Sequence, residues 1–417
     1  MPRTLADWLG HIEAQHPQAI ALGLERVAEV LGRLDAKISC PLLVVGGTNG
    51  KGSTCALLEA ILRAARYRTG LYTSPHLLRY NERVRIDGSP APDDALCESF
   101  AAVESARQGV PLTYFEFGTL SAAWLFARAR LDAAILEVGL GGRLDAVNAF
   151  DADCAVVTGI AVDHVEYLGS DRDSIAREKA GIFRAGRPAV VAEPDPPPSL
   201  IAPGPKHFLY GKDFGFAVQD RQWNYWGPGG TRPALAHPAL RGAIQLRNAA
   251  AALAALDALR ERLPVATQEV RRGLAEVTLA GRFQVLPGRP QVILDVAHNP
   301  EAATVLAENL AASGFSAETI AVFGMLRDKD IAGVVRALDP RVTRWLVASL
   351  PGPRGASGAA LAEALAEERV RGSVAVHGSI ADAFAVARET AGENDKIVAF
   401  GSFLTVAEVM AWLNRRT

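Results

Sequence analysis

Short, uninterrupted apolar runs alternate with amphipathic helical patterns along most of the chain. In the first half, LLVVGG, DAAILEVG and CAVVTGIAVDH have the composition of buried strands. The segments STCALLEAILRAARY and RDSIAREKAGIFRAG, which lie between strands of this kind, have the pattern of helices, and the second ends at a glycine. Wholly apolar strands joined through helices form parallel sheets that are covered on both faces. The sequence therefore predicts an α/β protein with a parallel-rich sheet.

The same rhythm begins again in the last third of the chain. The runs QVILDVA, TIAVFGM, TRWLVAS, SVAVHG and KIVAFGS recur there, and a helical pattern follows each of them. We expect a first domain at residues 1–281 and a smaller Rossmann-like α/β domain at residues 282–417, which fits a length of 417 residues. Between 206 and 240, HFLYG, FGFAV and WNYWGPGG predict a small antiparallel excursion within the first domain.

The composition excludes several classes of function. A formal net charge of -2 gives no electrostatic case for binding nucleic acid or an anionic membrane. The four cysteines are scattered and include no CxxC pair, which argues against a zinc site or a disulfide framework. The first residues lack the apolar core of a signal peptide, and no apolar run is long enough to span a bilayer. We expect a cytoplasmic protein, monomeric by default.

Residues 44–55 read VVGGTNGKGSTC and resemble a phosphate-binding loop with one departure. In the common P-loop, the Gly-Lys pair is followed directly by Ser or Thr, whereas here Gly52 separates Lys51 from Ser53. The setting of strand, glycine-rich turn and helix suits phosphate binding by backbone N–H groups and a helix N-terminus. Lys51 would then meet the β- and γ-phosphates, and Ser53 would bind magnesium. The structural alternative is a tight turn with an incidental lysine.

Polar residues follow two further apolar strands, at the edge where ligands of open α/β sheets bind. Glu137 ends one strand and is well placed for Mg²⁺, although a solvated strand-end acid is the alternative. Asp163 and His164 end another strand, and a lone histidine is more often structural. Asp145, after a double glycine, suits a loop cap or a substrate acceptor. Lys179 lies in a predicted helix, where a solvated lysine is the ordinary interpretation.

Other segments suit substrate binding. Residues 72–88, YTSPHLLRYNERVRIDG, would serve as an exposed loop that closes over a substrate. The segment LTYFEFGTLSAAWLF begins with Thr113 and two aromatic rings, which suit a flat heterocycle as well as they suit core packing. In the second domain, Asp295, His298 and Asn299 follow one strand, and the segments 324–330 and 399–403 follow others. All three clusters are predicted at the carboxyl ends of strands.

The loop spelling GTNGKGS resembles that of the Mur ligase and folylpolyglutamate synthase superfamily. Within it, the chain is similar over its whole length to the bacterial bifunctional dihydrofolate synthase/folylpolyglutamate synthases. The shared motifs are LGLERV, GTNGKGST, YTSPHLLRYNERVRI, LTYFEFGTL, ILEVGLGGRLDAVN, DHVEYLG, REKAGIFR, GRFQ, DVAHNP, MLRDKDIAG, GPRGA and GSFLTVAEVM. The resemblance implies an N-terminal P-loop ATPase domain that carries a pteroate pocket and a C-terminal Rossmann-like domain that closes over ATP and glutamate.

The resemblance also implies a reaction. A substrate carboxylate takes the γ-phosphoryl group of ATP, and the amino group of L-glutamate then displaces phosphate from the acyl phosphate. With 7,8-dihydropteroate the product is dihydrofolate, and with reduced folates a glutamate tail grows. The implied cofactors are ATP and two Mg²⁺ ions, and the family pattern admits a monovalent cation such as K⁺. Positioning and charge neutralisation are the main requirements of such phosphoryl transfer.

Matching motifs carry the family's site residues onto this sequence. The implied ATP-binding residues are Gly47, Thr48, Asn49, Gly50, Lys51, Gly52, Ser53, Asn248, Arg282 and Asp295. The implied metal-binding residues are Ser53, Ser74, Glu137, His164 and Lys179, of which Lys179 resembles a lysine that the family N-carboxylates. The implied pteroate-binding residues are Ala21, Leu22, Gly23, Thr113, Tyr114, Phe115, Leu144, Asp145 and Ala146, with Phe115 against the pterin ring. Lys51, His164 and Lys179 would be catalytic, and His298 and Ser402 would lie on the glutamate side.

Three alternatives remain open from the sequence. A monofunctional folylpolyglutamate synthase would lack activity on dihydropteroate. A Mur-type cell-wall ligase would need a uridine-nucleotide-binding region, whereas this chain starts almost directly with the ATPase domain. A nucleotide-switch binding protein would bind ATP without ligating anything. Release of ADP that depends on both pteroate and glutamate separates these cases.

Overall fold

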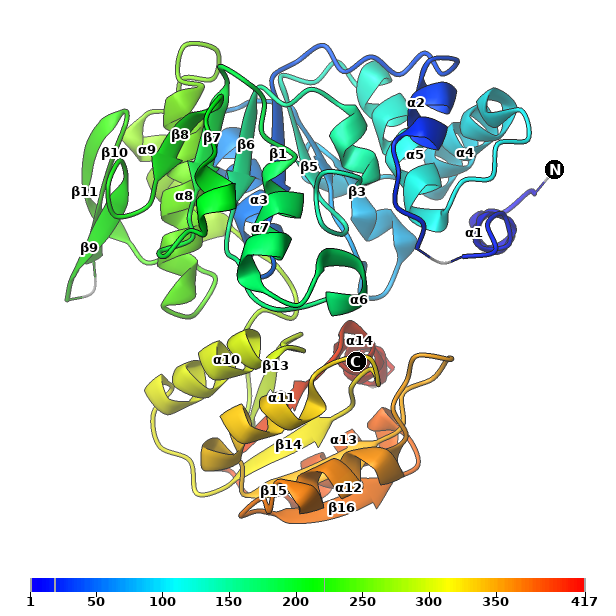
Figure 1. The fold of residues 1–417 in the computed structure, drawn as a ribbon. Helices are drawn as coiled ribbons and strands as arrows, with labels where there is room; N and C mark the ends of the chain where they lie inside the picture. Colours follow the sequence, from blue (N-terminus) through cyan, green and yellow to red (C-terminus); the bar gives the residue numbers. More distant parts are fainter. Residues whose placement is uncertain (1, 19, 221, 416–417) are drawn as a thin grey trace. The chain divides into compact units, whose positions relative to one another are not determined.

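The computed structural model describes residues 2–18, 20–220 and 222–415, and the chain divides into two compact units (Figure 1). The first unit comprises Met1–Ala239 and Gln245–Val277, and the second comprises Leu240–Ile244 and Thr278–Thr417. Each unit has its own sheet and its own hydrophobic core. The two units are described separately below.

The first unit is built on a mixed sheet, which has eight strands in the described part of the chain. Their order is β4-β3-β2-β5-β1-β6-β7-β8. The neighbours from β2 to β8 run parallel, and β3 and β4 extend one edge in antiparallel fashion. The bounds are β1 Leu42–Gly46, β2 Thr69–Tyr72, β3 Val84–Ile86, β4 Ser89–Pro90, β5 Ala133–Glu137, β6 Cys154–Val157, β7 Pro188–Val191 and β8 Lys206–Leu209. Every residue of the central strands β1, β5 and β6 is buried, as continuous apolar runs predict.

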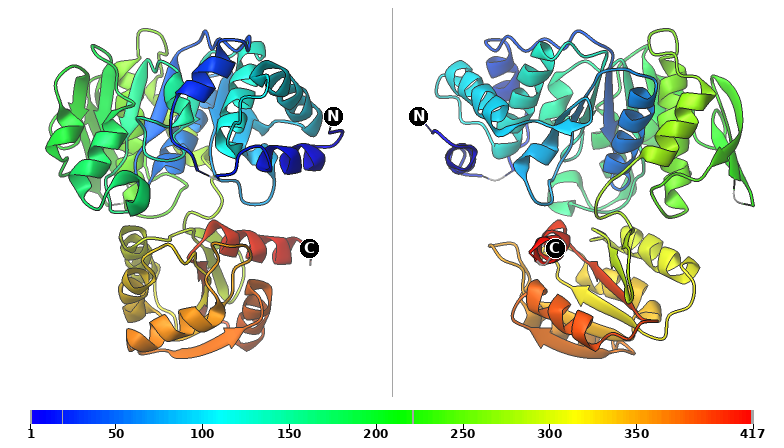
Figure 2. Two further views of the ribbon diagram at one scale, coloured as in Figure 1. Left: turned by 45° about the vertical axis from the view of Figure 1, so that its right-hand side comes forward. Right: turned by 180° about the vertical axis from the view of Figure 1, so that it is seen from behind.

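Helices lie on both faces of this sheet (Figure 2). The α-helices are α1 Leu5–Glu13, α2 Glu25–Leu31, α3 Lys51–Ala64, α4 Asp93–Arg107, α5 Tyr114–Arg128, α6 Val165–Leu168, α7 Arg172–Ala180, α8 Ile244–Ala258 and α9 Thr267–Glu276, and the 3₁₀ turns are η1 Tyr80–Arg83, η2 Ala146–Ala149 and η3 Pro198–Ile201. Helix α3 packs on β1, β2 and β5 and also against α9. It is therefore a central helix, and the loop that precedes it is fixed at the carboxyl end of β1.

Two sequence-based expectations need correction in this unit. The segment HFLYG does not belong to the antiparallel excursion, because β8 pairs in parallel with β7 and extends the main sheet. The antiparallel sheet contains only β9 Gly215–Gln219, β10 Gln222–Gly227 and β11 Gly230–Ala236 among the described residues. The segment 72–88 is also not a single exposed loop, since residues 84–86 pair with β2. Short strands such as β3 and β8 carry too few apolar residues to be recognised by pattern.

The second unit is a smaller α/β sandwich around a sheet ordered β12-β13-β17-β14-β15-β16. All neighbours run parallel except β12 and β13, as expected for a Rossmann-like domain. The strands are β12 Gln284–Leu286, β13 Gln291–Leu294, β14 Thr319–Phe323, β15 Arg344–Ala348, β16 Ser373–His377 and β17 Lys396–Phe400. The helices are α10 Pro300–Ala312, α11 Ile331–Leu338, α12 Gly358–Glu367, α13 Ile380–Thr390 and α14 Phe403–Asn414, with the 3₁₀ turn η4 Asp339–Arg341. The predicted α/β fold class is confirmed.

The described helices include no candidate membrane span. None of those in residues 2–18, 20–220 and 222–415 combines the length and the apolar character that crossing a bilayer requires.

Candidate active site

The glycine-rich loop lies between β1 and α3 and is held by the segment after β6. The Thr48 N–H donates to the Gly159 oxygen over 2.8 Å, and the Thr48 hydroxyl donates to the Ala161 oxygen over 3.1 Å. Gly47 has φ +139°, and a Cβ there would lie 2.0 Å from the Thr158 hydroxyl oxygen. The loop therefore follows a path that a side chain at position 47 would block, as expected for a cradle of backbone N–H groups.

The N-terminus of α3 adds further features of a phosphate site. Gly50 caps the helix with φ +90°, and a Cβ there would lie 2.6 Å from the Asn248 Oδ1 atom. Asn248 comes from α8, so the structure places it against the loop. Ser53 is buried in the first turn of α3, and the dipole at this helix end favours an anion.

Two lysines meet at the loop. The Lys51 Nζ donates to the main-chain oxygens of Gly47 and Thr48, each over 3.1 Å. The Lys179 Nζ, from α7, donates to the same Gly47 oxygen over 3.0 Å. The interpretation of Lys179 as an ordinary solvated helix lysine is therefore wrong, because its side chain is buried and points to the loop.

Burial is the main influence on the protonation of Lys179. Burial and, after it, the positive charge of Lys51 together lower the pKa of this amine to about 7, against the opposing effect of the carboxylates of Asp163 and Asp145. Asp145 is itself buried, which raises the pKa of its carboxyl to about 7 despite N–H bonds from Leu140 and Val147. An amine whose pKa is near neutral pH thus lies in the same electrostatic environment as a carboxyl of unusually high pKa.

Glu137 lies at a strand end, as expected from the sequence, but the expectation that Asp163 and His164 end a strand is wrong, because β6 ends at Val157. Glu137 closes β5 with 4% of its surface exposed, and its Oε2 accepts the Ser74 N–H over 3.1 Å. His164 caps α6 with φ +53°, and its Nε2 lies 4.0 Å from Asp163 Oδ2. Among the described residues, no three His, Cys, Asp or Glu side chains gather as a protein-only metal cage.

Three segments far apart in sequence, each expected at the pteroate pocket, come together in the structure. The Gly23 N–H donates to the Leu144 oxygen over 3.1 Å, which joins segment 21–23 to segment 144–146. Arg26 joins segment 21–23 to the start of α5, because it donates to the Ala21 oxygen over 2.7 Å and to both carboxylate oxygens of Glu116. Segment 113–115 begins that helix.

The aromatic rings of segment 113–115 have different surroundings. The Phe115 ring is half-buried, its centroid lies 5.8 Å from that of Tyr72, and a Cβ at Gly139 would be only 2.6 Å from its Cζ. The Tyr114 ring lies 5.2 Å from the guanidinium carbon of Arg83. Thr113 caps the helix in a capping box with Glu116.

In the second unit, the expected residues gather at the carboxyl ends of the neighbouring strands β13 and β17. Asp295 is partly buried and accepts the N–H groups of Phe283 and Ala297, each over 2.8 Å, and loss of solvation raises the pKa of its carboxyl. The Phe403 ring lies 5.0 Å from the Arg282 guanidinium carbon and 6.4 Å from the His298 ring. Ser402 caps α14 and accepts the Leu404 N–H.

The sequence interpretation missed four side chains that organise these sites. Thr158, directly after β6, donates to the Asn49 oxygen over 2.6 Å and so fixes the glycine-rich loop. Arg26 and Glu116 form the link within the predicted pteroate pocket. Phe403 lies between Arg282 and His298. No spacing in the sequence indicates that an arginine and a glutamate 90 residues apart, such as Arg26 and Glu116, will pair.

The fold and the loop define an ATP-dependent ligase of the Mur type. The model of the Mur ligase middle domain matches residues 45–256, and that of the Mur ligase glutamate ligase domain matches residues 281–403. The dihydrofolate synthase/folylpolyglutamate synthase of Escherichia coli is 47% identical over 417 residues, which cover 99% of this chain and 96% of that protein. The family suggested by the motifs is thus confirmed: the chain belongs to the bifunctional dihydrofolate synthase/folylpolyglutamate synthases.

Solved structures agree with this assignment. The E. coli FolC structure in complex with DHPP and ADP superimposes with a TM-score of 0.94 at 46% identity, and the match covers 99% of this chain and 98% of that one. A bifunctional folylpolyglutamate synthase/dihydrofolate synthase with Mn, AMPPNP and L-glutamate bound gives a TM-score of 0.91 at the same identity and coverage.

Proposed function

We propose that this enzyme joins L-glutamate to 7,8-dihydropteroate, giving dihydrofolate, and to reduced folates, giving folylpolyglutamates. The observation that carries the proposal is the convergence at one edge of the main sheet. The loop with Lys51, the strand-end carboxylate Glu137 and the buried Lys179 lie at the same edge as Asp145 of segment 144–146. The relatives support it, since E. coli FolC binds DHPP and ADP, and another relative binds AMPPNP, Mn and L-glutamate.

In this proposal, the loop binds the phosphates of ATP. The backbone N–H groups from Gly47 to Ser53 and the N-terminus of α3 stabilise the anionic oxygens, and Lys51 moves from the Gly47 and Thr48 carbonyls to the β- and γ-phosphates. Asn248, from α8, orients the nucleotide at the loop. The role of the loop is to place the γ-phosphorus in line with the attacking carboxylate.

The residues present fit divalent metal ions that are shared with the nucleotide. Mg²⁺ is usually bound through one or two carboxylates, phosphates and water, and Glu137 is a buried carboxylate beside the Ser74 N–H. Ser53, Ser74, Glu137, His164 and a carboxylated Lys179 would hold two ions. When bound, they neutralise phosphate charge and polarise the transferred phosphoryl group. The low pKa of Lys179 favours the neutral amine that carboxylation needs.

The acceptor carboxylate would be presented by the segments 21–23, 113–115 and 144–146, with the pterin against Phe115. Its oxygen forms a bond to the γ-phosphorus, and the bond from that phosphorus to ADP breaks. The neutral amino group of glutamate then attacks the acyl carbon. Phosphate leaves with the carboxylate oxygen, and the nitrogen loses a proton as the amide forms.

This sequence of bonds can be tested directly. Dihydropteroate labelled with ¹⁸O in its carboxylate should deliver one ¹⁸O atom to inorganic phosphate per amide formed. ADP release should require dihydropteroate and glutamate together, and tetrahydrofolate should replace dihydropteroate. ADP release that needs neither dihydropteroate nor tetrahydrofolate would indicate a nucleotide switch. Activity with tetrahydrofolate but not with dihydropteroate, each tested together with glutamate, would indicate a monofunctional folylpolyglutamate synthase.

A further inference from the structure

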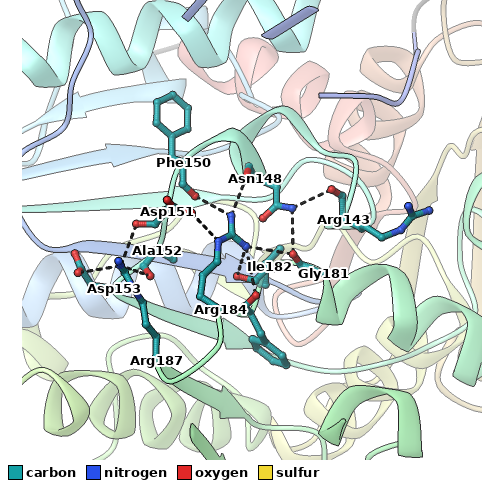
Figure 3. A network of polar contacts seen from close by, with 11 residues as sticks. Arg143, Asn148, Phe150, Asp151, Ala152, Asp153, Gly181, Ile182, Arg184 and Arg187 are labelled. Carbon is teal, nitrogen blue, oxygen red and sulfur yellow. Dashed lines mark hydrogen bonds and ion pairs between the residues drawn. The ribbon is translucent and has the colours of Figure 1, made fainter. Parts of the chain in front are cut away.

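Arg184 follows the C-terminal end of α7, and its guanidinium is surrounded by main-chain oxygens (Figure 3). Its Nη1 donates to the oxygens of Gly181, Ile182 and Phe183 over 3.2–3.4 Å, which satisfies carbonyls just past the helix end. Its Nη2 donates to the oxygens of Asn148 over 3.0 Å and Phe150 over 3.2 Å. One planar group thus joins the turn after α7 to the segment 148–150.

Asn148 makes a second connection between the same two segments. Its Nδ2 donates to the Arg143 oxygen over 2.9 Å and to the Gly181 oxygen over 3.1 Å, and Figure 3 shows this amide beside the Arg184 group. The backbones are also in direct contact. The Arg143 N–H donates to the Glu178 oxygen over 2.7 Å, and a Cβ at Gly142 would lie 3.0 Å from the Lys179 Cα.

The two joined segments carry different parts of the site. Lys179 lies two positions before Gly181 on α7 and reaches the ATP loop. Asp145 and Leu144 lie just before Asn148, whose N–H donates to the Asp145 oxygen over 2.8 Å. The separation between the Lys179 amine and the loop 140–148 is therefore set by the contacts that Arg184 and Asn148 make.

We propose that Arg184 is a positioning residue that holds Lys179 in register with the loop 140–148, and so couples the metal-binding side of the site to acceptor binding. The assignment of metal ions to Lys179 and of the acceptor to the loop 140–148 rests on the proposed function. The ion pair with Asp151 contributes little, since that carboxylate is 78% exposed. The carbonyl contacts matter more, because only a planar fork donates in several fixed directions at once, which a lysine cannot do.

A matched pair of variants tests the proposal. Arg184→Lys keeps the charge and removes the fork. The control is Arg187→Lys, three positions along the same turn, because the Arg187 side chain donates to the segment 151–153, with the Ala152 oxygen at 2.8 Å and Asp153 among its partners (Figure 3). Arg184→Lys and Arg187→Lys are assayed at a temperature at which both variants are folded. If Arg184→Lys is unstable, Asn148→Ala replaces it, because Asn148 makes the other connection between the two segments.

Arg184→Lys should raise the half-saturating Mg²⁺ concentration and the KM for dihydropteroate by about tenfold, the loss typical of supporting contacts around a metal site. The KM for L-glutamate should change by less than about twofold, and Arg187→Lys should change each constant by no more than that. Equal effects of the two lysine variants, or a uniform fall in activity, would show a merely structural role.

Hydrogen exchange supplies a readout that does not need turnover. In the proposal, Arg184→Lys accelerates amide exchange in both 142–148 and 176–182, and Arg187→Lys does not. Acceleration in only one of the two segments would overturn the coupling. A wild-type enzyme without acceptor-dependent ADP release would refute the proposed function, and the exchange result would still decide whether Arg184 joins the two segments.

Discussion

The side-chain amines of Lys51 and Lys179 both donate to the main-chain oxygen of Gly47, over 3.1 and 3.0 Å. One lysine begins the helix after the ATP loop and the other comes from α7, so a single carbonyl joins the two. Two amines so close disfavour double protonation, and Lys51 accordingly lowers the pKa of Lys179 in addition to the larger effect of burial. The two lysines therefore need separate tests.

Lys51→Ala should abolish both synthase activities. Loss of a preorganised donor to developing charge typically costs about 10²–10³-fold in kcat. The fold should survive, because the two hydrogen bonds of Lys51 go to loop carbonyls at a ligand site rather than to the core. Turnover, circular dichroism and thermal melting measure these effects, and substantial remaining turnover in a folded variant would refute the role.

Phe115→Ala should impair dihydrofolate synthesis more than polyglutamylation. A stacked ring contributes about 0.5–1.5 kcal/mol beyond area burial, so the KM for dihydropteroate should rise by roughly two- to tenfold. The measurement is the ratio of the two activities at matched saturation, together with the melting temperature.

The same helix provides the control for this prediction. Phe117 is fully buried in the core of the first unit. Phe117→Ala should therefore lower the free energy of unfolding by about 3–5 kcal/mol without favouring either activity. If Phe115→Ala behaves in the same way, its ring is a core residue and the assigned contact with the pterin is wrong.

Arg26→Lys should weaken acceptor binding and leave the KM for ATP unchanged. Arg26 donates to both oxygens of the buried Glu116 and to the Ala21 oxygen, and an ammonium cannot satisfy these acceptors together. The free energy of unfolding should fall by about 1–3 kcal/mol, the cost of a buried group left partly unpaired. Kinetics with dihydropteroate and chemical denaturation measure the two effects.

An exposed pair nearby is the control for Arg26. Arg33 and Glu29 form an i,i+4 pair at the surface, and Arg33→Lys should change stability by less than about 0.5 kcal/mol. A double-mutant cycle of Arg26 and Glu116 should give a coupling of about 0.5–3 kcal/mol. A coupling near zero would mean that the pair does not hold segment 21–23 in place.

Periodicity and glycine placement predicted the strands β1, β5 and β6, the helices between strands and the loop before α3. These features are local, since a buried strand or a P-loop turn is encoded within a dozen residues. The expectation that HFLYG belongs to the antiparallel excursion was wrong, because β8 pairs in parallel with β7, and KHFL has no continuous apolar run that would mark it as a strand of the main sheet.

The residues of the site also separate into those that the local sequence predicts and those that depend on contacts between distant segments. Glu137 stands at a strand end, where the order of the chain places it, whereas His164 lies beyond the end of β6 and caps α6. The convergence of Lys179 on Gly47, 132 positions away, depends on how α7 packs on the loop, and no pattern in the sequence contains that information. The resemblance to the family predicted a role for Lys179 in the site, whereas its position in a predicted helix, taken alone, favoured a solvated side chain.

Lys179 should be N-carboxylated in the working enzyme. Carbamate formation consumes the neutral amine and CO₂, and burial, followed by Lys51, lowers the pKa of this amine to about 7. The folded protein consequently binds fewer protons here than the unfolded chain between about pH 7 and the ordinary lysine value of 10.5. In that window the contribution of this group to stability rises with pH, and it is least favourable below about 7.

At constant CO₂ pressure, a ¹³C carbamate resonance should therefore grow as the pH rises through about 7. Lys179→Ala should remove that resonance and most of the activity, and a short carboxylic acid should restore part of the activity by supplying the missing negative charge near the metals. Lys206→Ala, at an exposed strand end, is the control and should keep both. A nucleotide-bound crystal at neutral pH with an unmodified Lys179 amine directed to solvent would disprove the modification, and so would a resonance that persists in Lys179→Ala.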